Sequence, residues 1–162
     1  MLTMALVFVL VLIRFNGKMF WGKHIDNKLI WKEHIKHVNS KIFRALYILR
    51  TVKQIISCRH LKILYSTLVQ PHTLYGITLW GSTYLSYLKK AIVLQKKAVQ
   101  LINKSEYNAH TAQLFNTCNI LTLKSMYGLE TVKFMFDYIR KSLPKSLMEH
   151  FTLSSAYHDQ NT

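Results

Sequence analysis

Acidic residues are scarce in this sequence. Of its 162 residues only 7 are Asp or Glu, against 22 Lys and Arg, which gives a formal net charge of +15. Polymerases and nucleases use closely placed carboxylates to hold two metal ions about 4 Å apart. No two carboxylates are adjacent here, and Glu130 and Asp137 would stand roughly 10 Å apart along a helix. We therefore expect no two-metal catalytic site.

Cysteine pairs and known catalytic motifs are also lacking. Cys58 and Cys118 lie in different segments without a CxxC pair, which argues against a disulfide framework. No GxSxG, P-loop or dinucleotide fingerprint occurs. His34 and His37, beside Glu33, lack a third ligand at matching spacing, so we expect two partly exposed histidines. The sequence predicts no catalytic residue, no metal and no cofactor.

The apolar run at residues 2–13 is too short for a standard transmembrane helix. It is interrupted only by Thr3 and covers 12 residues, whereas a spanning helix needs about 20. Its length suits a signal peptide, yet no Lys or Arg precedes it and no clear cleavage site follows. For residues 1–17 the sequence leaves a strand, an anchor and a signal open.

The positive charge favours a polyanionic partner. Nucleic acid and an anionic membrane surface both present closely spaced phosphates, so net charge alone does not choose between them. Solubility is the third explanation of the charge. Basic residues gather on the polar sides of two expected helices, where they repel one another unless an anion or solvent relieves them. The candidates for nucleic-acid binding are Lys32, Lys36, Arg44, Arg50, Lys89, Lys90, Lys96 and Lys97.

Apolar residues recur at the three-and-four spacing of helices over most of the chain. The pattern predicts helices at about 31–53, 57–71, 83–102, 109–117 and 123–141, and Pro71 ends or kinks the second. Residues 74–81 read as helix or tight turn in the core, and residues 20–25 as a strand stub. The expected fold is all-α, a small bundle of about five helices with a short N-terminal strand remnant.

Two of these helices carry detailed expectations. Ser82 is the candidate N-cap of the long helix, and Leu85 would begin its apolar face. The last helix places five apolar residues at the three-and-four spacing of one helical face, namely Met126, Leu129, Val132, Phe136 and Ile139. Trp31, Tyr75 and Trp80 could stack on bases, although we expect core packing for each.

Several short motifs follow one another in a characteristic order. Residues 20–35 read FWGKHIDNKLIWKEHI, and residues 94–98 read LQKKA. Between and after them stand Leu64-Tyr65, Pro71-His72, Tyr75-Gly76, Trp80-Gly81, His110-Thr111, Leu114-Phe115 and Leu143-Pro144. Over about residues 18 to 151 this order resembles the region after the catalytic YxDD strand in Jockey-like, non-LTR retrotransposon reverse transcriptases. That family has leucine where Trp21 stands and proline where Gln113 stands.

The resemblance implies a helical thumb and connecting domain over residues 18–151, followed by a polar tail at 152–162. Such a domain would hold a template-primer duplex of RNA or DNA. Phe20, Gly22 and Asp26 would be the remnant of the primer grip. The palm carboxylates and the YxDD strand of the family have no counterpart in this sequence. We therefore expect the chain not to be an enzyme by itself.

Three functional interpretations follow. The leading one is a truncated reverse-transcriptase fragment in the nucleus or cytoplasm that binds RNA or DNA without sequence preference. The alternative is a membrane-associated or secreted basic helical protein, with residues 2–13 as anchor or signal and its cationic helices on anionic lipid. The third is a segment that acts only together with a palm-containing reverse transcriptase.

Overall fold

The computed structural model describes residues 19–20, 23–24, 30–105 and 110–148. These include one antiparallel ladder, in which β1 (Met19–Phe20) pairs with β2 (Lys23–His24). The remaining elements are α2 (Lys32–Val52), α3 (Cys58–Leu68), α4 (Gln70–Leu74), α5 (Ile77–Trp80), α6 (Leu85–Ile102), α7 (Thr111–Cys118), α8 (Leu123–Ile139) and α9 (Lys145–Met148). The all-α prediction is confirmed.

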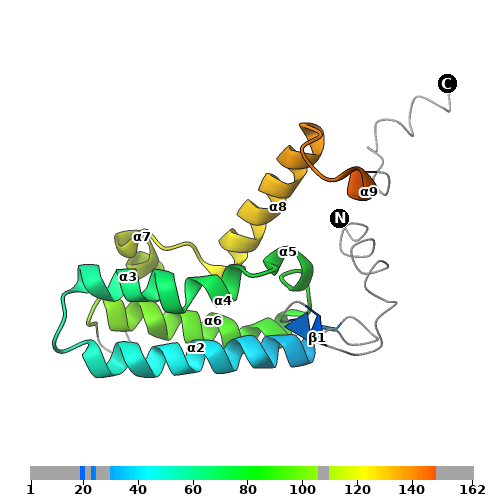
Figure 1. The fold of residues 1–162 in the computed structure, drawn as a ribbon. Coiled ribbons are helices and arrows are strands. Elements are labelled where there is room, and N and C mark those ends of the chain that lie inside the picture. The colour runs from blue at the N-terminus through cyan, green and yellow to red at the C-terminus, as the bar shows by residue number, and fades with distance from the viewer. Residues whose placement is uncertain (1–18, 21–22, 25–29, 106–109, 149–162) are drawn as a thin grey trace.

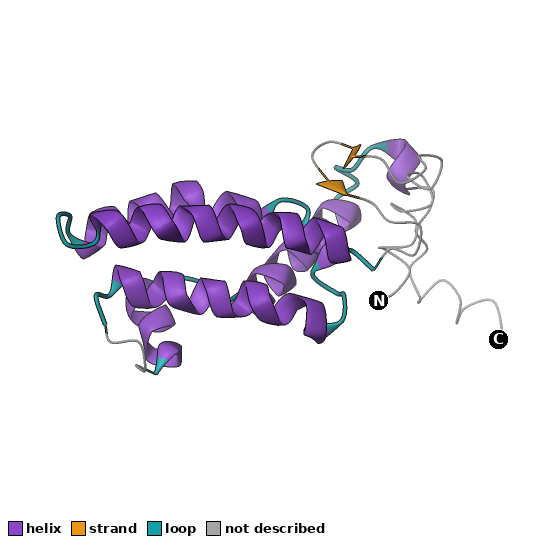
Figure 2. Cartoon of the chain, turned by 90° about the horizontal axis from the view of Figure 1, so that it is seen from below, coloured by secondary structure: helices purple, strands orange, loops and turns teal. Residues whose placement is uncertain are grey.

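The short ladder stands where the strand remnant was expected. It lies beside one end of the helical bundle, next to α2 (Figure 2). Gly22 and Asp26 of the expected primer grip, the segment 1–17 and the tail 152–162 lie outside the described residues.

The bundle is organised around α2 and α6, which lie along each other with α3 packed against both (Figure 1). Ile35 near the start of α2 shares a core cluster with Leu88 near the start of α6. Leu49 near the end of α2 shares a second cluster with Ile102 at the end of α6. The two helices therefore run in the same direction, and their C-terminal ends lie together.

The buried face of α2 is the one that the periodicity predicted. Its members are Ile35, Val38, Ile42, Ala45, Leu46 and Leu49, and all are buried. His34 joins them with 2% of its surface exposed, and its ring meets the rings of Trp31 and Trp80 at centroid distances of 6.0 and 5.9 Å. The expectation of two partly exposed histidines is therefore wrong for His34, whereas core packing of both tryptophans is confirmed. Tyr75 is 47% exposed, so the expectation of core packing is wrong for this residue.

Gln95, which is only 1% exposed, joins α6 to three other parts of the chain. Its Nε2 donates to the Tyr65 hydroxyl at 3.0 Å and to the Leu121 carbonyl at 2.9 Å. Its Oε1 accepts from the backbone N–H of Leu123, the first residue of α8, at 2.8 Å. Burial raises the pKa of Tyr65, and the hydrogen bond from Gln95 partly opposes this. The glutamine of the LQKKA motif thus fixes the start of α8.

The chain between α3 and α6 changes direction through two short helices. Pro71 lies in the first turn of α4, where its missing N–H leaves no helical hydrogen bond unmade, so it separates α4 from α3. Gly76 precedes α5 with φ of 62°, a left-handed conformation that favours glycine.

Helix α6 begins later than the sequence suggested. Its N-cap is Tyr84 and not Ser82. The reason is a tertiary contact, because the Thr83 hydroxyl donates to the Ile30 carbonyl at 2.9 Å and holds the preceding turn against the entry to α2. Leu85 is then the first helical residue and is 71% exposed, so the expectation that it begins the buried face is wrong.

Helix α8 projects away from the bundle (Figure 1). Its first turns contact α5, α4 and α6 and bury Leu123 and Met126. The rest of the predicted apolar face is exposed, at Leu129, Val132, Phe136 and Ile139. Contact with the bundle therefore covers this apolar face only as far as Met126.

A capping contact fixes the N-terminal end of α8. The Thr122 hydroxyl accepts from the backbone N–H of Ser125 at 3.2 Å. We expect Thr122→Ala to lower the free energy of unfolding by about 1 kcal/mol, because one helix N–H loses its acceptor. Ser57 precedes α3 but makes no capping bond to the backbone. Ser57→Ala should therefore change the free energy of unfolding by less than half as much as Thr122→Ala. Urea denaturation of both variants measures the difference.

Candidate nucleic-acid interface

One side of α2 carries two aromatic rings between cationic residues. Lys36, Phe43 and Arg50 follow one another at intervals of seven residues, or about two helical turns, so they share one side of the helix. Tyr47 is four residues after Phe43 and three before Arg50, which places it on the same side. Phe43 is 65% exposed and Tyr47 is 71% exposed. These residues border the buried face of α2 without entering it.

The four lysines predicted on α6 divide between two sides of that helix. Lys90 and Lys97 are seven residues apart and share one side, and so do Lys89 and Lys96. Lys89 directly precedes Lys90, and Lys96 directly precedes Lys97. The two pairs therefore lie about 100° apart around the helix axis. Lys97 belongs to the side that faces α2, together with Leu94 and Leu101.

A cleft of about 270 Å³ opens between the C-terminal halves of α2 and α6. Leu46, Leu94 and Leu101 form its apolar floor, and Phe43 and Tyr47 form its wall on the α2 side. Three cationic residues, Arg50, Lys53 and Lys97, line it together with Gln100 and Ser105. None of the described residues that line the cleft is acidic. The cleft therefore combines positive charge with exposed aromatic surface.

Part of the positive charge serves the helix itself. Arg50 lies in the last turn of α2, where a cation stabilises the partial negative charge of the unpaired carbonyl groups by about 0.3–1 kcal/mol. Arg50 alone can supply this stabilisation of α2. It therefore does not explain why Lys97 of α6 lines the cleft as well. Lys97 lines the same cleft as Arg50 and Lys53, so three cationic side chains from two helices border one space.

The structure separates the eight predicted residues into three groups. Arg50 and Lys97 both line the cleft. Lys32, Lys36 and Lys90 lie on the same sides of α2 and α6 but nearer the start of each helix. Arg44 directly follows Phe43 and so points about 100° away from that side. The pair Lys89 and Lys96 is likewise displaced around α6.

Sequence reasoning missed Phe43, Tyr47 and Lys53. The sequence contains a signal for the two aromatic residues. Both fall outside the spacing of the buried residues of α2, and they share the side of the helix that carries Lys36 and Arg50. Two exposed aromatic residues that are neighbours and are flanked by cations form an apolar patch with a polar rim, which is a feature of interaction sites. Lys53 is the C-cap residue of α2 and was counted only as the helix end.

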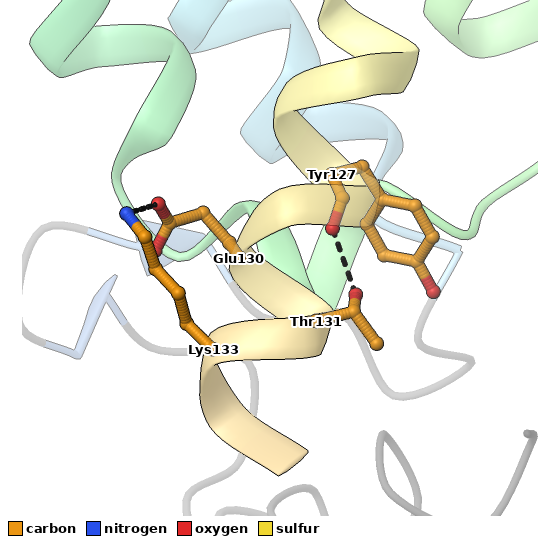
Figure 3. A network of polar contacts seen from close by, with 4 residues as sticks. All are labelled: Tyr127, Glu130, Thr131 and Lys133. Carbon is orange, nitrogen blue, oxygen red and sulfur yellow. Dashed lines mark hydrogen bonds and ion pairs between the residues drawn. The ribbon is translucent and has the colours of Figure 1, made fainter. Parts of the chain in front are cut away.

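The described carboxylates are dispersed. Glu33 pairs with Lys36 at 3.6 Å, and Glu130 pairs with Lys133 at 2.7 Å on α8. Figure 3 shows the second pair and, on another side of α8, the hydroxyl of Thr131, which donates to the Tyr127 carbonyl at 2.8 Å. Such exposed pairs contribute about 0–1 kcal/mol. Among the residues described, no group of three His, Cys, Asp or Glu side chains could hold a metal ion.

Within the described part of the chain, none of the helices has the length and apolar character needed to cross a bilayer. Residues 2–13, on which the membrane interpretation depends, lie outside that part.

Comparison with known proteins finds distant relatives in transposons of Drosophila melanogaster. The chain is 25% identical over 125 residues, 75% of its length, to a probable RNA-directed DNA polymerase from transposon BS. It is 22% identical over 148 residues, 90% of its length, to a probable RNA-directed DNA polymerase from transposon X-element. The chain spans 14% of the length of each relative. No protein-family model and no solved structure matches.

These similarities confirm the reverse-transcriptase-like relationship that the motifs predicted. The position of the chain behind a palm domain stays a prediction. The molecule described above is thus a basic helical chain related at a distance to the RNA-directed DNA polymerases of transposons.

Proposed function

We propose that the chain is a non-catalytic, retrotransposon-derived segment of a reverse transcriptase that binds the phosphate backbone of RNA or DNA without sequence preference. It would do so in the nucleus or cytoplasm, where such nucleic acids occur. Arg50, Lys53 and Lys97 would neutralise phosphates at the cleft, and Lys32, Lys36 and Lys90 would extend the contact toward the start of α2 and α6.

The observation that carries this proposal is the convergence of cations from two helices on one cleft that has no described acidic lining. Arg50 and Lys97 come from different helices and line the same cleft. Phosphate contacts from Lys and Arg carry no base information, which explains why no sequence preference is expected. The distant similarity to RNA-directed DNA polymerases supports nucleic acid over other polyanions.

The salt dependence of binding tests the proposal. Fluorescence anisotropy of the full chain with a labelled RNA-DNA hybrid should show binding that weakens with salt. If Z phosphates are contacted on a duplex, log K falls with log salt at a slope of about −0.9Z, so five contacts give about −4.5. A folded chain that shows no binding even at about 50 mM salt, or binding with a flat salt dependence, would contradict it.

A second candidate function rests on α8. Its exposed residues Leu129, Val132, Phe136 and Ile139 fall at helical spacing and form one apolar side. We propose that this side contacts a palm-containing reverse transcriptase, so that the chain acts as part of a larger enzyme. Exposed apolar sides of this kind are typical of protein interaction sites. Co-purification with a palm domain that fails for Phe136→Glu would support this candidate.

A further inference from the structure

We propose that the cleft between α2 and α6 receives an unpaired base, so that the chain prefers single-stranded segments over continuous duplex. This inference rests on the proposed function, because it assigns the bases to the same site at which the phosphates are held. The cationic residues Arg50, Lys53 and Lys97 hold the backbone, and the rings of Phe43 and Tyr47 hold the base.

The composition of the cleft favours a planar, partly polar ligand attached to an anion. Its floor is apolar at Leu46, Leu94 and Leu101, while Gln100 and Ser105 add polar groups at one end. A purely electrostatic contact with a duplex needs cations only and gains nothing from exposed aromatic rings. Burying the two rings against water-exposed bases would remove apolar surface from water, which is favourable.

The size of the cleft sets an upper limit on what enters it. Pockets that hold drug-sized ligands measure about 300–1,000 Å³, and this cleft measures about 270 Å³. It therefore suits a group no larger than one or two bases. A duplex keeps its bases stacked and paired, so only an unpaired nucleotide could turn a base into this space.

The two aromatic residues are placed for stacking. Phe43 and Tyr47 are one helical turn apart, so their side chains are neighbours on the surface of α2. Both rings are mostly exposed although they line the cleft. Proteins that bind single strands without sequence preference combine such aromatic platforms with a positively charged groove. The same combination occurs here, because the cations flank the rings on the same cleft.

The test compares three probes with the full chain under identical salt. The probes are a single-stranded oligonucleotide of about 16 nucleotides, its abasic counterpart with the same phosphates, and the corresponding duplex. Variants Phe43→Leu and Tyr47→Leu remove the rings but keep apolar side chains at exposed positions. The matched control is Tyr84→Leu, which removes an exposed ring outside the cleft.

The single strand should bind about tenfold more tightly than the abasic strand, since stacking on one ring contributes enough for about that factor. Phe43→Leu with Tyr47→Leu should erase the difference between the intact and the abasic strand, and Tyr84→Leu should keep it. A single strand carrying 5-iodouracil should crosslink to Tyr47 or Phe43. Equal binding of intact and abasic strands, unaffected by the ring variants, would overturn the inference and leave phosphate binding intact.

Two other outcomes can be told apart from equal binding of the intact and abasic strands. If the full chain shows no salt-dependent binding to any of the three probes, the proposed function and this inference are refuted together. Concentration-dependent dimerisation that Tyr47→Leu abolishes would show that a second copy of the chain fills the cleft, and would overturn the inference as well.

Discussion

Replacing Arg50 and Lys97 together by glutamate is expected to weaken nucleic-acid binding by about 100-fold at low salt. Both side chains line the cleft, one from each helix. Losing two phosphate contacts should make the slope of log K against log salt shallower by about 1.8 on a duplex, and by about 1.4 on a single strand. Fluorescence anisotropy across a salt series measures both quantities.

The matched control is the double variant Lys89→Glu with Lys96→Glu. It produces the same change in formal charge, from +15 to 15 − 4 = +11, but on the side of α6 away from the cleft. The affinity of this control for nucleic acid should fall only a few-fold, because only the general electrostatic attraction is weakened. Equal losses for the two pairs would show that total charge, and not the cleft, determines binding.

Replacing Gln95 by leucine is expected to lower the free energy of unfolding by about 3 kcal/mol. The substitution would leave the N–H of Leu123 and the carbonyl of Leu121 without the hydrogen bonds that Gln95 makes with them. Each buried polar group that loses its partner costs about 1–3 kcal/mol. The Tyr65 hydroxyl loses a donor as well. Urea denaturation followed by circular dichroism gives the change.

Gln113→Leu is the control for that experiment. Gln113 is an exposed residue of α7, and its replacement should alter the free energy of unfolding by no more than about 0.5 kcal/mol. A Gln95→Leu variant that is as stable as the wild type would contradict the role assigned to the buried hydrogen bonds.

Local periodicity predicted the helices well, and tertiary contacts explain where it failed. The spacing of Ile35, Ile42 and Leu49 identified the buried face of α2 because that face is buried along its whole length. The start of α6 was misplaced because it depends on the bond from Thr83 to Ile30, which lies 53 residues earlier. No local pattern reports such a contact.

Helix α8 shows a different limit of sequence reasoning. Its apolar spacing is as regular as that of α2, yet Val132 and Phe136 are exposed while Met126 is buried. Periodicity identifies which residues share a side of a helix, but it does not tell whether another element covers that side.

The candidate site was predicted in part. The sequence identified the basic residues, but the side of α6 that faces α2 is decided by packing. For that reason Lys97 lines the cleft with Arg50, whereas Lys96, its neighbour in the sequence, does not. Phe43 and Tyr47 were overlooked because apolar residues were assigned to the core, and both are exposed.

Lysine footprinting tests the central claim most directly, because it locates the nucleic acid on individual side chains. The full chain is acetylated with and without an RNA-DNA hybrid carrying a single-stranded overhang, and each lysine is quantified by mass spectrometry. Protection of Lys53 and Lys97, with Lys89 and Lys96 still modified, is the result expected if the cleft holds the backbone. Equal protection of all four lysines, or protection of Lys89 and Lys96 alone, would contradict this account.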